Sequence, residues 1–126
     1  MSLEIVQTAD APPPAGHYSQ AIVHGNVAYV CGCLPIEPHT GRHVHGTIEE
    51  ETRQVLENIF VILAAAGSAP SRVLSVTVYV VDIELWPKVN EVYAAAFGNH
   101  RPARTVVTVE KLHHDFLIEI SAIAAV

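Results

Sequence analysis

The sequence predicts a single mixed domain of six β-strands and two α-helices, in the order β-β-β-α-β-α-β-β. Half of the 126 residues are hydrophobic, which is enough for one core. Two segments carry apolar residues at helical spacing. Six short segments carry the apolar and β-branched residues typical of strands, and Gly25-Asn26 separates two of them. We therefore treat residues 1–126 as one domain.

The first third of the chain predicts three strands and two connectors. Strands are predicted at 3–7, 20–24 and 27–33. Residues 11–16 contain three consecutive prolines, so this segment forms an extended connector and not a helix or a central strand. Gly25-Asn26 lies between the second and third strands and predicts a tight hairpin turn. Residues 35–46 are rich in Pro, His and Gly and are expected to form a loop.

Two helices and three further strands follow. Thr47-Ile48-Glu49-Glu50 fits a capping box, and this helix should continue to about Ala66 and stop at Gly67. Asp82 is expected to cap a second helix that reaches Gly98. Strands are predicted at 73–81, 104–109 and 116–124.

Two helices cannot cover both faces of a six-stranded sheet. Residues 73–81 are nevertheless apolar at nearly every position, which is typical of a strand buried on both faces. Only 16% of the residues are charged, less than in an average domain. The simplest cover for the second face is the sheet of another subunit, so we expect an oligomer.

The charge balance and the chain start exclude several classes of protein. The net charge is −6, and the seven Lys and Arg residues are scattered, which argues against nucleic-acid binding. We expect a soluble cytoplasmic protein, because no apolar stretch approaches a membrane span and no signal peptide precedes the domain. Cys31 and Cys33 flank Gly32 and are expected to be free thiols, since a disulfide across one residue would be strained.

Arg104 and Glu119 stand out because each is a charge within an apolar strand segment. A buried charge needs a partner or a task. A guanidinium suits a carboxylate, and a sheltered glutamate can act as a base, so together they indicate a pocket where a small acid reacts with water. The alternative is a structural ion pair. A simple hairpin would place Glu119 opposite Thr108, about 13 Å from Arg104 along the strand. The sequence pattern alone therefore does not predict contact between Arg104 and Glu119.

Other candidate groups have ordinary structural explanations. His43, His45 and the pair His113-His114 lack HExxH spacing, and no CxxC pair accompanies them, so solvated loop histidines are favoured over a metal site. Cys33 would be a nucleophile only beside a group that lowers its pKa, and a buried inert thiol is the default.

Several segments together resemble the RidA/YjgF family of reactive intermediate imine deaminases. The segments that carry this resemblance are Gly16–Ala21, Tyr29–Gly32, Pro38–Gly41, Asn58-Ile59, Val89–Tyr93, Pro102–Arg104 and Ile118–Ile120. They occur in order over nearly the whole chain, and Pro-Ala-Arg followed by Ile-Glu-Ile is the most specific part.

The resemblance implies a chorismate-mutase-like α+β fold with a six-stranded mixed sheet and two helices on one face. It implies a homotrimer with sites between subunits, and a last strand inserted within the sheet instead of in a hairpin. Metal and cofactor are not expected. The implied reaction is hydrolysis of a 2-imino acid, or its enamine tautomer, to a 2-keto acid and ammonia.

Residue roles carry over only through the resemblance. Arg104 would clamp the substrate carboxylate, and Glu119 would activate water and protonate the departing nitrogen. Tyr18 would line the pocket from the neighbouring subunit, and the main chain of Gly32 would approach the ligand. Asn90 matches the helix motif without a specified role. Without the resemblance, Tyr18 and Asn90 are equally consistent with surface packing and a solvated amide.

Four positions depart from the family pattern. Cys31 and Cys33 stand where many members have serine and glutamine, Val106 replaces a cysteine, and His113 replaces a proline. Cys33 and Val106 are therefore candidate pocket residues that alter substrate choice. Two other functions stay open: a non-catalytic trimer that binds small carboxylic acids or partner proteins and, less favoured, an endoribonuclease.

Overall fold

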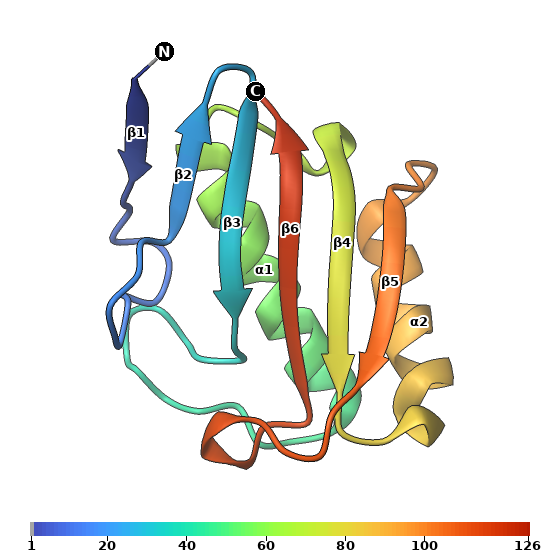
Figure 1. The fold of residues 1–126 in the computed structure, drawn as a ribbon. Helices are drawn as coiled ribbons and strands as arrows, with labels where there is room; N and C mark the ends of the chain where they lie inside the picture. The colour runs from blue at the N-terminus through green and yellow to red at the C-terminus, as the bar shows by residue number, and fades with distance from the viewer. Residues whose placement is uncertain (1) are drawn as a thin grey trace.

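The computed structural model describes residues 2–126, and its elements follow the predicted order (Figure 1). The strands are β1 (Leu3–Val6), β2 (Ala21–His24), β3 (Val27–Cys33), β4 (Val73–Val80), β5 (Ala103–Thr108) and β6 (Ile118–Ala125). The helices are α1 (Ile48–Ala65) and α2 (Trp86–Phe97). Short 3₁₀ turns precede β4, α2 and β6.

The six strands form one mixed sheet in the order β1-β2-β3-β6-β4-β5. Only β4 and β5 are parallel, and every other neighbouring pair is antiparallel. Both helices lie on the same face of the sheet (Figure 1). β6 lies between β3 and β4 and does not pair with β5, which confirms the inserted last strand that the family resemblance implies.

The first predicted helix is confirmed, but the start of the second is wrong. Thr47 caps α1 by accepting a hydrogen bond from the Glu50 amide, and Gly67 adopts a positive φ of 84° beyond the helix end. Asp82 instead caps a 3₁₀ turn at 83–85, and α2 begins at Trp86 without a side-chain cap. A proline in its first turn fixes a helical φ and has no amide hydrogen that needs a partner.

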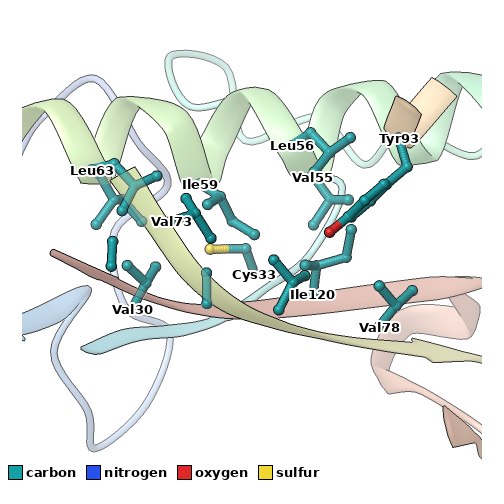
Figure 2. Packing of buried hydrophobic residues seen from close by; sticks show 14 of the residues in the cluster. Val30, Cys33, Val55, Leu56, Ile59, Leu63, Val73, Val78, Tyr93 and Ile120 are labelled. Carbon is teal, nitrogen blue, oxygen red and sulfur yellow. The ribbon is translucent and has the colours of Figure 1, made fainter. Parts of the chain in front are cut away.

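The hydrophobic core lies between α1 and the sheet. Figure 2 shows Val30, Cys33 and Ile120 of the sheet packed near Val55 and Ile59 of α1. All five side chains are buried. At about 25 cal/mol per Å² of apolar surface removed from water, this layer provides the main stabilisation of the domain.

The opposite face of the sheet is apolar but uncovered. Ile22, Tyr29 and Ile123 are paired in register across β2, β3 and β6. Tyr29 is 50% and Ile123 37% exposed, and the neighbouring Ile5 on β1 is 71% exposed. An apolar stripe across adjacent strands is unusual on a free surface.

Two burial expectations are wrong for the single chain. β4 alternates, with Val76, Val78 and Val80 buried and the intervening residues partly exposed, because the helices cover one face only. β5 is an edge strand, so Ala103 to Thr105, which includes Arg104, is exposed. β-branched composition predicts a strand but not its place in the sheet. Within residues 2–126, neither helix has the length and apolarity needed to cross a membrane.

A buried amide attaches the loop after β3 to α1. Asn58 is 1% exposed, and its side-chain nitrogen donates to the carbonyl oxygens of Leu34 at 3.0 Å and Ile36 at 2.9 Å. These bonds satisfy two loop carbonyls away from water. They therefore fix the chain that leaves β3 just after Gly32 and Cys33.

We predict that Asn58→Ala lowers the free energy of unfolding by about 1–3 kcal/mol, because two partly buried carbonyls lose their donor. Urea unfolding monitored by circular dichroism measures this change. Glu57→Ala, at an exposed position on the same helix, is the control and should change stability little. Equal stability of the two variants would contradict the anchoring role of Asn58.

Candidate active site

Arg104 is held against α2 by two aromatic rings and an amide. It pairs in register with Val76 of β4, whose side chain is buried against the helices, so Arg104 lies on the helix side of the edge strand. Its guanidinium carbon is 4.6 Å from the Trp86 ring centroid and 4.9 Å from that of Tyr93. Nη1 donates to Asn90 Oδ1 at 3.0 Å. The guanidinium is therefore oriented before any ligand binds.

This arrangement assigns a structural task to Asn90 and adds two residues that sequence reasoning missed. Trp86, Asn90 and Tyr93 are at positions i, i+4 and i+7 of α2, which places them on one helix face. That spacing was the available signal in the sequence. The Tyr93 hydroxyl is buried without a hydrogen-bond partner among the described residues, and burial raises its pKa.

An open cleft of about 450 Å³ lies beside the Arg104 guanidinium. Asn90, Tyr93, His100 and Arg101 also line it. Among residues 2–126, no carboxylate lies within ion-pair distance of Arg104, so the structural ion pair with Glu119, the alternative to a functional site, is absent from the single chain. Val106 follows two residues later on the same side of β5 and is partly buried against the core.

Glu119 lies on the opposite face of the sheet from Arg104. It pairs in register with Tyr79, between the buried Ile118 and Ile120, and is half-buried. Desolvation raises the pKa of its carboxyl group, and the nearby His113 partly offsets that rise. A pKa moved toward neutrality suits a group that accepts and then returns a proton.

The carboxyl group of Glu119 packs against the main chain of Gly32. β3 bulges between Val30 and Cys33, where it pairs with β6, and this brings the Gly32 main chain against the Glu119 carboxyl group. A Cβ at position 32 would lie 3.1 Å from Glu119 Cδ and even closer to Oε2. Glycine therefore leaves room for the Glu119 carboxyl group in this position, and a larger residue would displace that side chain.

Tyr18 and Cys33 share a small cavity with Gly32. The cavity has a volume of about 70 Å³ and is also lined by Cys31 and by prolines of the connector. Tyr18 is 50% exposed, and its hydroxyl accepts a hydrogen bond from the Ala15 amide. The connector is itself fixed by the buried side chain of Gln20, which bonds the backbone of residues 8 and 12.

The predicted site residues therefore form two separate groups within one chain. Arg104, Asn90 and Val106 lie on the helix side of β5, whereas Glu119 and Gly32 lie together on the other face of the sheet. Val76 of β4 pairs with Arg104 on one side and with Ala122 of β6 on the other. Ala122 is three residues from Glu119, which is about 10 Å along β6. A small molecule cannot contact both charges of the same chain.

The loop histidines cluster in a way that the sequence did not predict. The buried Phe116 is surrounded by His43, His45 and His114. The His45 ring stacks on the Phe116 ring with 4.8 Å between centroids, and the centroids of His43 and His114 are 4.6 Å apart. In the described part of the chain, no three His, Cys, Asp or Glu side chains are placed to hold a metal ion. The cluster contributes aromatic packing beneath the start of β6.

The six-stranded mixed sheet with both helices on one face defines an α+β protein, and comparison with known proteins identifies the family. The chain belongs to the family described as endoribonuclease L-PSP, whose model matches residues 8–126. A RutC family protein of Pyrococcus horikoshii is 52% identical over 121 residues, or 96% of each chain.

Two further relatives bear on function. The human protein named 2-iminobutanoate/2-iminopropanoate deaminase is 38% identical over 120 residues, covering 95% of this chain and 88% of the human protein. The solved structure of Escherichia coli TdcF with bound serine has a TM-score of 0.93 and 32% identity, and the match covers 98% of each chain. These findings confirm the resemblance and the α+β fold that it implies.

We predict that Glu119→Gln stabilises the protein at neutral pH. Because the pKa of Glu119 is raised in the folded state, the folded protein holds this proton more tightly than the unfolded chain does. The free energy of unfolding therefore falls as pH rises from about 4.5 to the raised pKa, and it stays lower at higher pH. Glutamine has no charge to desolvate. The gain should appear in urea unfolding at neutral pH and shrink below pH 4.5.

Glu57→Gln, which removes the same charge from an exposed site, is the matched control. An equal gain in both variants would attribute the effect to net charge and not to the surroundings of Glu119.

Proposed function

We propose that the protein hydrolyses short 2-imino acids, or their enamine tautomers, to 2-keto acids and ammonia at sites completed between copies of a homotrimer. The observation that carries this proposal is the orientation of the Arg104 guanidinium beside an open cleft. Its guanidinium is oriented by Trp86, Tyr93 and Asn90, yet it faces an open cleft without a carboxylate partner in the described chain. Such a fork matches the carboxylate of an amino-acid-derived substrate.

The second copy supplies what Arg104 lacks. Arg104 lies on an edge strand, whereas Glu119 lies on the uncovered face, so packing the edge of one chain against that face of another brings the two charges together. The apolar stripe of Ile22, Tyr29 and Ile123 gives this packing a hydrophobic component. Repeating the contact around a threefold axis closes a ring with three equivalent sites.

Hydrolysis then needs one acid–base group. Arg104 holds the carboxylate and places the C=N carbon near Glu119 of the second copy. The Glu119 carboxylate takes a proton from water as the water oxygen bonds to that carbon. The resulting carbinolamine receives that proton on nitrogen. The C–N bond then breaks, ammonia departs, and Glu119 takes the hydroxyl proton as the carbonyl of the keto acid forms. Orientation and one proton carrier suffice because a protonated imine is already electrophilic.

The names and ligands of relatives support this reading. The human relative is named a deaminase of 2-iminobutanoate and 2-iminopropanoate, which are short 2-imino acids. TdcF binds serine, an amino acid that also presents a carboxylate. The family description instead names an endoribonuclease. The net charge of −6 favours a small acid over RNA, because phosphate binding requires clustered cations.

We predict that Arg104→Ala abolishes both turnover and binding of 2-oxobutanoate, whereas Glu119→Gln lowers turnover by about 10²–10⁴-fold and retains binding. The imine is generated in situ by an amino-acid oxidase, and keto-acid release and ligand binding are measured separately. Arg53→Ala, which removes an exposed arginine on α1 outside this cleft, is the matched control and should keep both activities.

Three outcomes would contradict this proposal. Turnover equal to buffer in the native protein over a panel of imino acids would exclude the deaminase. Ligand binding with no effect of Glu119→Gln on any activity would indicate a carboxylate-binding trimer without catalysis. RNA cleavage that persists through purification and is lost in Arg104→Ala would favour the endoribonuclease.

A further inference from the structure

Cys31 and Cys33 are brought together by the bulge in β3. In a regular strand, the Cα atoms of residues i and i+2 are about 6.6 Å apart, and their side chains point to the same face. The register of β3 against β6 shifts between Val30 and Cys33, and the two sulfur atoms lie 4.0 Å apart. Both cysteines are free thiols. The bulge thus turns two positions of one strand into a neighbouring dithiol with glycine between them.

The two thiols have different surroundings. Cys33 is 6% exposed and packs in the core between the sheet and α1 (Figure 2). Cys31 is partly exposed and lines the small cavity with Tyr18 and Gly32. Contact with the Cys33 sulfur lowers the pKa of Cys31, whereas the same contact and burial raise the pKa of Cys33. Cys31 is therefore the accessible nucleophile, and Cys33 the sheltered thiol behind it.

We propose that Cys31 and Cys33 form a peroxide-oxidisable dithiol, in which Cys31 attacks the peroxide and Cys33 resolves the product to a reversible disulfide. The Cys31 thiolate sulfur bonds to one peroxide oxygen, the O–O bond breaks, and the leaving hydroxide takes a proton to become water. Cys33 sulfur then attacks the Cys31 sulfenic acid, an S–S bond forms, and a second water leaves. Peroxide is reduced and the two thiols are oxidised.

Closing this bond moves the wall of the candidate active site. The sulfur atoms must approach from 4.0 Å to about 2.05 Å. The residue between them is Gly32, and the carboxyl group of Glu119 lies directly against its main chain. Any shift of that backbone displaces the proton carrier. The expected loss of turnover rests on the proposed function, whereas the thiol chemistry itself does not.

The test follows thiols and turnover in the same samples. Reduced protein is treated with hydrogen peroxide, and remaining thiols are tagged with a maleimide in denaturant and counted by mass spectrometry. The native protein should lose both tags together, lose the mass of two hydrogen atoms, and regain both tags with dithiothreitol. Keto-acid release should fall on oxidation and return on reduction.

Two single variants assign the roles. Cys33→Ser should form a sulfenic acid at Cys31 that dimedone traps, because no resolving thiol remains. Cys31→Ser should react with peroxide at least about ten-fold more slowly than the native protein, because only the buried thiol is left. Both substitutions are nearly isosteric, and the native protein provides the decisive readout without any variant.

The proposal is overturned if peroxide leaves both native thiols free at doses that oxidise Cys31 in Cys33→Ser. It is also overturned if oxidation yields only disulfides between chains or irreversible acids. A disulfide that forms without any change in turnover would overturn the link to Glu119. A protein that never hydrolyses imines would instead contradict the proposed function, and the thiol counts would still decide the dithiol.

Discussion

The insertion of β6 between β3 and β4 determines where every candidate functional side chain lies. It places Glu119 opposite the bulge of β3, where glycine at position 32 leaves room for the carboxyl group. It also leaves β5 at the sheet edge, with Arg104 facing α2. A hairpin of β5 and β6 would lose both placements. The topology therefore separates Arg104, the proposed carboxylate-binding group, from Glu119, the proposed proton carrier, within one chain.

One-sided coverage by helices is the second consequence of this topology. With α1 and α2 on the same face, the core is complete on that side while an apolar stripe remains exposed on the other. The exposed stripe and the separation of Arg104 from Glu119 are independent observations. The proposed association of copies through the uncovered face would account for both. Burial of that face would also further desolvate Glu119 and raise its pKa in the same direction as burial within the single chain.

Periodicity was sufficient to predict the elements but not their pairing. Helix α1, from the cap at Thr47 to the stop at Gly67, follows from local signals alone. The insertion of β6 depends on contacts between distant strands, which period and turn residues do not encode, and only the family resemblance predicted it. Arg104 was a clear candidate as a charge among β-branched residues, but its exposure on an edge strand and its contacts with Trp86 and Tyr93 required coordinates.

The most direct test of a site shared between copies is subunit complementation. Arg104→Ala and Glu119→Gln chains carrying different tags are coexpressed, and oligomers containing both are purified. If the charges come from different copies, each purified mixed trimer contains one site in three with both native residues, and turnover returns to about one third of the native value. Mixed oligomers as inactive as either parent, beside active mixtures of native chains, would contradict a shared site.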